Sequence, residues 1–166
     1  MAIPFSILLV LLGVYLPQSV VLARHDGAEH RLPNRNVALL TVTTFVCVLV
    51  AAVFDPDIAR ALRPSLGLAV LAGAGAILLA LLAPALIGMG DAKTVFVVVL
   101  LALLCGGPVL IAGALASCLL AAVAGALVLA AARDRTVRIP VGPMLLAMPF
   151  LGLLGAPLVS SALGAV

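Results

Sequence analysis

The stretch "SLGLAVLAGAGAILLALLAPALIGMGDAK", residues 65–93, joins a long apolar run to a short polar segment. A helix rises about 1.5 Å per residue, so the apolar part, Ser65–Ile87, is long enough to cross a hydrocarbon core of about 30 Å. The run therefore predicts a membrane-spanning helix. At its end the glycines of "GMG" precede a carboxylate, Asp91, close to the point where the chain should leave the membrane.

The remainder of the chain has the same apolar character. Hydrophobic residues make up 66% of the 166 residues, charged residues only 9%, and the mean hydropathy is +1.41. These values lie outside the usual range of water-soluble domains. They predict an all-α membrane protein, a bundle of about six transmembrane helices that forms a single domain over residues 1–166. The expected spans are Ile3–Leu22, Val37–Phe54, Ser65–Ile87, Thr94–Cys105, Val109–Ala132 and Met144–Ala165.

Basic residues are distributed unevenly over the loops between these spans. The loops after the second and fourth spans carry Arg60 and Arg63 alone. Loops rich in Lys and Arg stay in the cytoplasm, so we expect both termini outside and the segments with Asp26 and Asp91 on the cytoplasmic side. The loops after the first, third and fifth spans carry seven basic residues: Arg24, Arg31, Arg35, Lys93, Arg133, Arg135 and Arg138.

Other partners and centres have less support in the sequence. The net charge of +3 is spread over short loops and is not gathered in a patch with aromatic residues, which argues against nucleic-acid binding. Cys47, Cys105 and Cys118 fall inside apolar runs and form no CxxC pair, so we expect no disulfide framework and no zinc site. Membrane lipid is the expected surrounding medium.

Two features of the spans bear on packing. The fourth span has only 12 residues, or about 18 Å of helix, so either its outer turn dips inward or the helix begins below the cytoplasmic surface and includes Asp91. Small residues recur at helical spacing, which lets helices approach closely in lipid. They are Gly113, Ser117, Ala121 and Gly125 in the fifth span, and Ala69, Gly73 and Gly75 in the third.

Asp91 has two interpretations when it is taken alone. It fits a structural role, in which glycines end the third helix and Asp91 caps the fourth. It also fits the GxGD pattern of membrane aspartyl proteases. The pattern is too short to decide between the structural and the catalytic interpretation, so the choice depends on the surrounding motifs.

Three elements in order support the catalytic interpretation. In "ARHDGAEHRLPNR", residues 23–35, Asp26 precedes a Leu-Pro-Asn turn by six residues, and "GMGD" follows at residues 88–91. "RIPVGPMLLA", residues 138–147, then precedes the last span. The set resembles the type IV prepilin peptidases, which carry an Asp before Ile/Leu-Pro-Asn, a GxGD and an Ile-Pro-Phe-Gly-Pro segment, here with Val141 in place of the aromatic residue.

The resemblance implies an aspartyl peptidase with Asp26 and Asp91 as the catalytic pair and with neither metal nor cofactor. Glycines beside the second aspartate are expected to let the backbone bring it close to its partner. Bringing Asp26 to Asp91 is expected to need movement of the first loop. The supporting positions that match the family motifs are Gly88, Gly90, Lys93, Pro33, Asn34, Pro140, Gly142 and Pro143.

The resemblance also implies a substrate and a location. The substrate is a prepilin or pseudopilin precursor, cleaved after a glycine on the cytoplasmic face of a prokaryotic plasma membrane. Many members of this family carry a methylation domain with paired CxxC motifs in the first cytoplasmic loop. Here that loop is short and lacks cysteine, as in the peptidase-only branch of tight-adherence pilus and preflagellin peptidases, so we expect cleavage without N-methylation.

Three alternatives remain open. Presenilin-type proteases share GxGD, although their first aspartate follows a tyrosine within a span, whereas Asp26 follows His25. A small transporter or structural subunit would use Asp26 and Asp91 to line an ion path. A metal site from His25, Asp26, Glu29 and His30 has suitable ligand types but no further shell.

Overall fold

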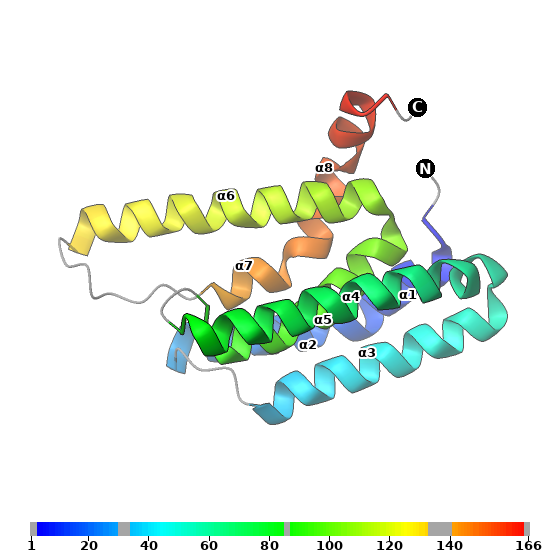
Figure 1. Cartoon of the computed structure of the whole chain (residues 1–166), viewed down its shortest axis with the longest axis horizontal. Coiled ribbons are helices and arrows are strands. Elements are labelled where there is room, and N and C mark those ends of the chain that lie inside the picture. Colours follow the sequence, from blue (N-terminus) through cyan, green and yellow to red (C-terminus); the bar gives the residue numbers. More distant parts are fainter. Residues whose placement is uncertain (1–2, 30–33, 85–86, 133–140, 165–166) are drawn as a thin grey trace.

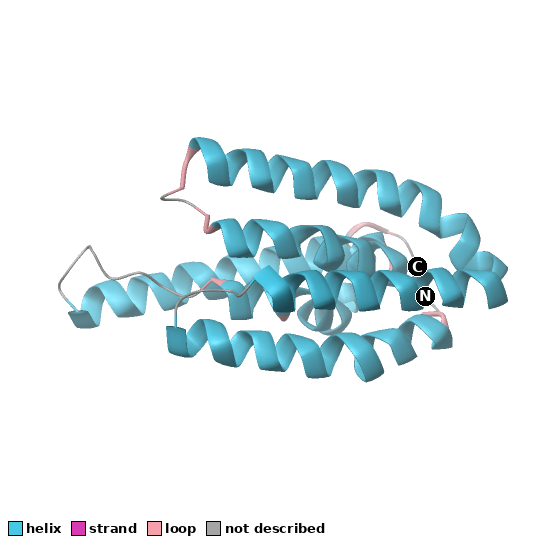
Figure 2. Cartoon of the chain, turned by 90° about the horizontal axis from the view of Figure 1, so that it is seen from below, coloured by secondary structure: helices cyan, strands magenta, loops and turns pink. Residues whose placement is uncertain are grey.

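The computed structural model describes residues 3–29, 34–84, 87–132 and 141–164, and every regular element in these ranges is helical (Figures 1 and 2). This confirms the all-α prediction. The elements are α1 (Phe5–Val10), η1 (Leu11–Tyr15), α2 (Leu16–Glu29), α3 (Asn34–Phe54), α4 (Pro56–Leu82), α5 (Met89–Cys105), α6 (Gly107–Ala132), α7 (Gly142–Leu146) and α8 (Met148–Ala162).

Four of these helical segments are long and apolar enough to cross a membrane, as expected of an integral membrane protein. The first is continuous through α1, η1 and α2, where η1 is a single π-helical turn. A fifth apolar helix, α8, is shorter. The four long segments are Phe5–Asp26, Asn34–Phe54, Pro56–Leu82 and Gly107–Val128.

Helix α4 begins nine residues before the predicted start of the third span. Asp55 caps it, because its side chain accepts a hydrogen bond of 3.0 Å from the backbone N–H of Asp57, and Pro56 occupies the first turn. The segment predicted as an outer loop is therefore helical, and it places Arg60 and Arg63 on the first turns of α4. The helix ends at Leu82, five residues before the predicted end at Ile87.

Helix α5 corresponds to the predicted fourth span and is longer than predicted. It starts at Met89 instead of Thr94, so its 17 residues give about 25 Å of helix and include Asp91. It ends at Cys105 as predicted, because Gly106 adopts a φ of 131°, a conformation that side-chain-bearing residues rarely adopt. Most of its residues after Asp91 are buried, and it contacts α3, α4, α6, α7 and α8, so α5 is the central helix of the bundle.

The predicted sixth span is broken into two helices, α7 and α8, which meet at Ala147. Pro149 lies in the first turn of α8, where a residue without an N–H is tolerated but would interrupt a continuous helix. Helix α8 packs closely on α6. A Cβ atom at Gly113 would overlap the carbonyl of Met148, and one at Gly152 would overlap that of Val109.

The small-residue prediction is thus confirmed where helices touch. Gly113 packs against α8, and Gly73 of α4 lies against Phe96 of α5, where a Cβ would be 3.0 Å from the Phe96 Cβ. Ala69 is fully buried. Gly75, by contrast, faces open space, so it makes no close helix contact.

The bundle has two distinct ends. The end of α2 and the starts of α3, α5 and α7 lie together on the left of Figure 1, whereas the α3–α4 and α5–α6 connections lie on the right, at the same end as the start of α1. The predicted motifs in the described residues therefore gather at one end.

Candidate active site

Asp26 lies on a helix, not in a loop as its position after the first span predicted. Helix α2 continues to Glu29, and the buried residues Tyr15, Ser19, Leu22 and Asp26 follow one another at spacings of four, three and four. Residues at this spacing share one helix face. Asp26 is 6% exposed, so the helix itself aims its carboxyl group into the bundle.

Asp91 lies in the first turn of α5, ahead of the apolar run Thr94–Cys105. The N-cap of this helix is Gly88, which makes no side-chain capping bond, so Asp91 is not the cap that the structural interpretation required. Its position at the helix start favours a negative charge. The Thr94 hydroxyl donates a hydrogen bond of 2.7 Å to the Asp91 carbonyl, which fixes this turn.

Both carboxyl groups point at Gly142, the first residue of α7. A Cβ atom at this buried glycine would lie 2.6 Å from Oδ2 of Asp26 and 2.9 Å from Oδ1 of Asp91. The sum of these distances, about 5.5 Å, is an upper limit for the separation of the two oxygens. The resting structure therefore already brings the pair together, and the expected movement of the first loop is not needed for that.

The closeness of the two carboxyl groups has an electrostatic consequence. Desolvation and a neighbouring like charge both disfavour ionisation, so two negative charges side by side are costly here. Carboxyl pairs of this kind are typical of acid–base sites.

One buried and one partly buried hydrogen bond hold the short helix α7 in place. The Tyr15 hydroxyl donates 2.9 Å to the carbonyl of Leu146, and the Ser117 hydroxyl donates 3.1 Å to the carbonyl of Met144. These residues come from η1 and α6, so α7 is tied from two sides. Neither residue was assigned a site role from the sequence. Tyr15 is the chain's single tyrosine and lies within an apolar run, where its hydroxyl must find a partner, and that was the available signal.

Apart from Gly142, the predicted supporting residues divide into three groups. Lys93 and Asn34 meet, because the Lys93 ammonium group donates 2.8 Å to Oδ1 of Asn34 and so links α5 to the start of α3. Gly88, Gly90 and Pro143 lie beside the pair on α5 and α7, although a Cβ at Gly88 would make only ordinary contact with Asp91. Pro33 and Pro140 lie outside the described residues.

The described part of the site offers few metal ligands. Among the side chains that the structure describes, no three from His, Cys, Asp and Glu come together as a metal would require. His25 is exposed on α2. The side chains of Glu29 and His30, the other members of the candidate metal cluster, lie outside those described.

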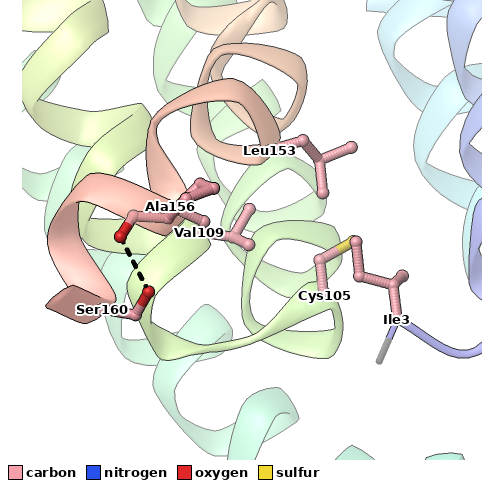
Figure 3. Close-up of a pocket in the computed structure, with 7 residues that line it drawn as sticks. Ile3, Cys105, Val109, Leu153, Ala156 and Ser160 are labelled. Atoms are coloured by element: carbon pink, nitrogen blue, oxygen red, sulfur yellow. Dashed lines mark hydrogen bonds between the residues drawn. The ribbon is translucent and has the colours of Figure 1, made fainter. Parts of the chain in front are cut away.

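Two cavities differ in their relation to the carboxyl groups. A groove of about 150 Å³ runs between α2 and α7–α8, lined by Ala23 and Pro143 near the aspartates. A larger cavity, of about 210 Å³, lies at the opposite end of the bundle and is lined by Ile3, Cys105 and Ser160, among others (Figure 3). The groove is therefore the cavity that bears on the site.

Comparisons with family models, curated proteins and solved structures gave no match for this chain. The candidate site consequently stands on the motifs and on the geometry of the described residues.

Proposed function

We propose that the protein is a membrane aspartyl endopeptidase that removes the leader peptide of prepilin-like precursors. The observation that carries this proposal is the convergence of Asp26 and Asp91 on Gly142. The three residues come from the three motifs that resemble those of the prepilin peptidases. A helix cap and a loop carboxylate would have no reason to face the same glycine.

The chemistry follows from two carboxyl groups in a poorly solvated site. Such a pair holds one proton between them because two adjacent negative charges are costly there. The ionised carboxylate takes a proton from water, whose oxygen attacks the scissile carbonyl carbon, while the protonated carboxyl hydrogen-bonds the carbonyl oxygen. The tetrahedral intermediate then expels the amine, which leaves with a proton from the pair. The proton belongs to the pair and is assigned to neither residue.

The proposed topology has six spans, both termini outside and the site at the cytoplasmic face of a prokaryotic plasma membrane. Helix α5 and the α7–α8 pair supply the two crossings beyond the four long helices. The end with the aspartates carries Arg24, Arg35 and Lys93, whereas Arg60 and Arg63 lie on α4 near the other end, which agrees with the positive-inside rule. A precursor with a basic leader in the cytoplasm and an apolar helix in the membrane would meet the pair at that face.

The proposal does not include the methylation activity of the larger family members. We expect cleavage without methylation of the new N-terminus, since the segment between α2 and α3 is too short for a methylation domain. Transfer of a methyl group from S-adenosylmethionine to the cleaved product by the purified protein would contradict this.

The deciding experiment compares carboxylates within one chain. The protein is co-expressed with a pilin-like precursor, and the leader is followed by mass spectrometry for the parent, Asp26→Asn and Asp91→Asn. Each variant should lower cleavage by at least about 100-fold. Asp57→Asn is the matched control, because Asp57 is an exposed carboxylate paired with Arg60 on α4, and it should cleave like the parent.

The outcomes separate the two candidate functions. Unchanged cleavage in either site variant removes that aspartate from the mechanism. If the parent cleaves no precursor, while proton or cation flux into proteoliposomes depends on Asp26 and Asp91, the protein is a small transporter and not a peptidase.

A further inference from the structure

Helix α6 meets α7 and α8 at points that are one helical turn apart. Gly113 lies so close to α8 that a Cβ there would overlap the carbonyl of Met148. Four residues further along α6, the hydroxyl of Ser117 reaches the carbonyl of Met144, which is four residues earlier in the chain than Met148. The α7–α8 segment therefore runs back along α6, and Ser117 is the point where α6 holds α7 (Figure 1).

The break between α7 and α8 leaves the carbonyl of Met144 without its usual donor. In a continuous α-helix the N–H four residues later would donate to it. The backbone bonds of α7 stop with the Ala147 N–H, which donates 3.0 Å to Pro143, and no backbone N–H of the described residues donates to Met144. An unsatisfied carbonyl is costly away from water. The Ser117 hydroxyl supplies the missing donor, 3.1 Å from the carbonyl oxygen.

Ser117 differs in this from other hydroxyl residues of the bundle. Serine and threonine in a helix often donate to a carbonyl one turn earlier in the same helix. Ser19 donates in this way to Leu16, and Thr41 to Val37. Ser117 is only 8% exposed, and it donates to a residue 27 positions along the chain, on another helix. Its hydrogen bond is therefore a tertiary contact between α6 and α7.

The two hydroxyl groups that hold α7 come from different parts of the bundle. Tyr15 lies on the continuous helical segment that carries Asp26, and its hydroxyl bonds the carbonyl of Leu146. Ser117 lies on α6, which follows α5, the helix that carries Asp91. Tyr15 thus fixes α7 relative to the first aspartate, and Ser117 fixes it relative to the part of the bundle that follows the second.

The position of α7 matters because Gly142 leaves little free space at the site. A Cβ at this residue would lie 2.6 Å from Oδ2 of Asp26 and 2.9 Å from Oδ1 of Asp91, so the backbone of α7 is close to both carboxyl groups. Met144 lies two residues after Gly142, in the same helical turn. A shift of α7 toward the pair would displace the carboxyl groups, and a shift away would leave them less constrained.

We propose that Ser117 is a positioning residue of the active site, which holds the first turn of α7 from α6 and so keeps Gly142 in place against the two carboxyl groups. The inference rests on the proposed peptidase function. Ser117 acts through α7 and takes no part in the proton transfers. Its loss should therefore lower kcat, which depends on how the carboxyl groups are placed, and leave KM unchanged.

Three substitutions at this position form a graded series. Ser117→Thr keeps a hydroxyl, Ser117→Cys offers a weaker donor, and Ser117→Ala removes the donor. Each is purified in detergent, and cleavage of one pilin-like precursor is measured below the lowest Tm of the set. Ser117→Ala should lower kcat at least about 10-fold with KM within about twofold of the parent. Ser117→Thr should recover kcat to within about threefold, and Ser117→Cys should fall between Thr and Ala.

A control variant separates positioning from general loosening of the helices. Gly155 lies on α8 at the same contact with α6, where a Cβ would be 3.0 Å from the Cβ of Ala112. Gly155→Ala therefore crowds the contact between α6 and α8 without removing the hydrogen bond to α7. It should keep kcat within about twofold of the parent.

Hydrogen exchange of the backbone gives a readout that does not depend on cleavage. The N–H groups of Met144 and Leu145 each donate 3.1 Å to the carbonyl of Val141, in the first turn of α7. These two should exchange at least about 10-fold faster in Ser117→Ala than in the parent, because the turn is no longer held from α6. The N–H of Leu163, at the end of α8, should exchange as in the parent.

Several results would overturn the inference. An unchanged kcat in Ser117→Ala, or unchanged exchange in α7, shows that the hydroxyl does not position the site. Equal losses of kcat in Ser117→Ala and Gly155→Ala show that any loosening of α6 has the same effect. If Ser117→Ala does not fold, a parent-like kcat in Ser117→Cys overturns the inference as well. If the parent cleaves no precursor, the peptidase proposal itself fails, and the role of Ser117 fails with it.

Discussion

The hydroxyl group of Tyr15 donates a hydrogen bond of 2.9 Å to the carbonyl oxygen of Leu146, 131 residues further along the chain. Both residues are buried, and the bond joins the π turn of the first helix to α7. Since α7 begins at Gly142, against which the two aspartates lie, this bond helps to set where the carboxyl groups meet.

Tyr15→Phe should therefore weaken the fold and loosen the site. It leaves the Leu146 carbonyl buried without its donor, at a cost of about 1 to 3 kcal/mol, so the apparent Tm in detergent should fall by several degrees. Ser160→Ala is the control, because the exposed Ser160 hydroxyl bonds only within its own helix, to Pro157, and its loss should leave Tm unchanged. Equal Tm values for Tyr15→Phe and the parent would show that this hydrogen bond does not stabilise the fold.

Gly142→Ala should abolish cleavage with little effect on folding. The added methyl group would lie 2.6 Å from Asp26 and 2.9 Å from Asp91, so at least one carboxyl group must move. A displacement of about 1 Å in a catalytic group costs about 100-fold in rate, measured here as leader cleavage. Gly75→Ala, at a helical glycine that faces open space, should cleave normally. Normal cleavage by Gly142→Ala would show that the space left by this glycine is not needed for catalysis.

Lys93 and Asn34 should act as one unit. Their side chains share a hydrogen bond of 2.8 Å at the surface, so Lys93→Met and Asn34→Ala each remove the same interaction. The double variant should lose no more stability than the larger single loss, within about 0.5 kcal/mol, which unfolding in denaturant can measure. Fully additive losses would show that the two residues act separately.

The sequence predicts the helices of this protein well and their ends less well. Long apolar runs predict helices that can cross a membrane, and four of the six predicted spans are long and apolar enough in the described residues to do so. The errors lie where polar residues remain helical, as at Asp26 in α2 and at Arg60 in α4. A cap such as Asp55 extends a helix beyond its apolar run, and hydropathy does not register it.

The candidate site could likewise be predicted only in part from the sequence. The motifs indicate Asp26, Asp91 and Gly142, and the structure brings these three together. The contact between Lys93 and Asn34 and the hydrogen bonds to α7 depend on how helices distant in sequence pack, which a single sequence does not reveal. Of the two glycines beside the aspartates, Gly142 and not Gly88 has the tighter steric demand, since a Cβ at 142 would collide with both carboxyl groups and one at 88 would make only ordinary contact with Asp91.

The π turn at Leu11–Tyr15 gives the first helix a place where a change in chain length can be absorbed. A π turn holds one residue more than an α-helical turn, whereas each residue of a regular α-helix rotates the chain by about 100°. Deleting one residue from η1, for example Gly13, would let the wide turn close into an α-helical turn and leave the face that carries Ser19, Leu22 and Asp26 turned toward α7. Deleting one residue between Ser19 and Asp26, in the regular helix, would instead rotate Asp26 by about 100° away from its partner, and would disarm the pair while leaving both aspartates in the sequence.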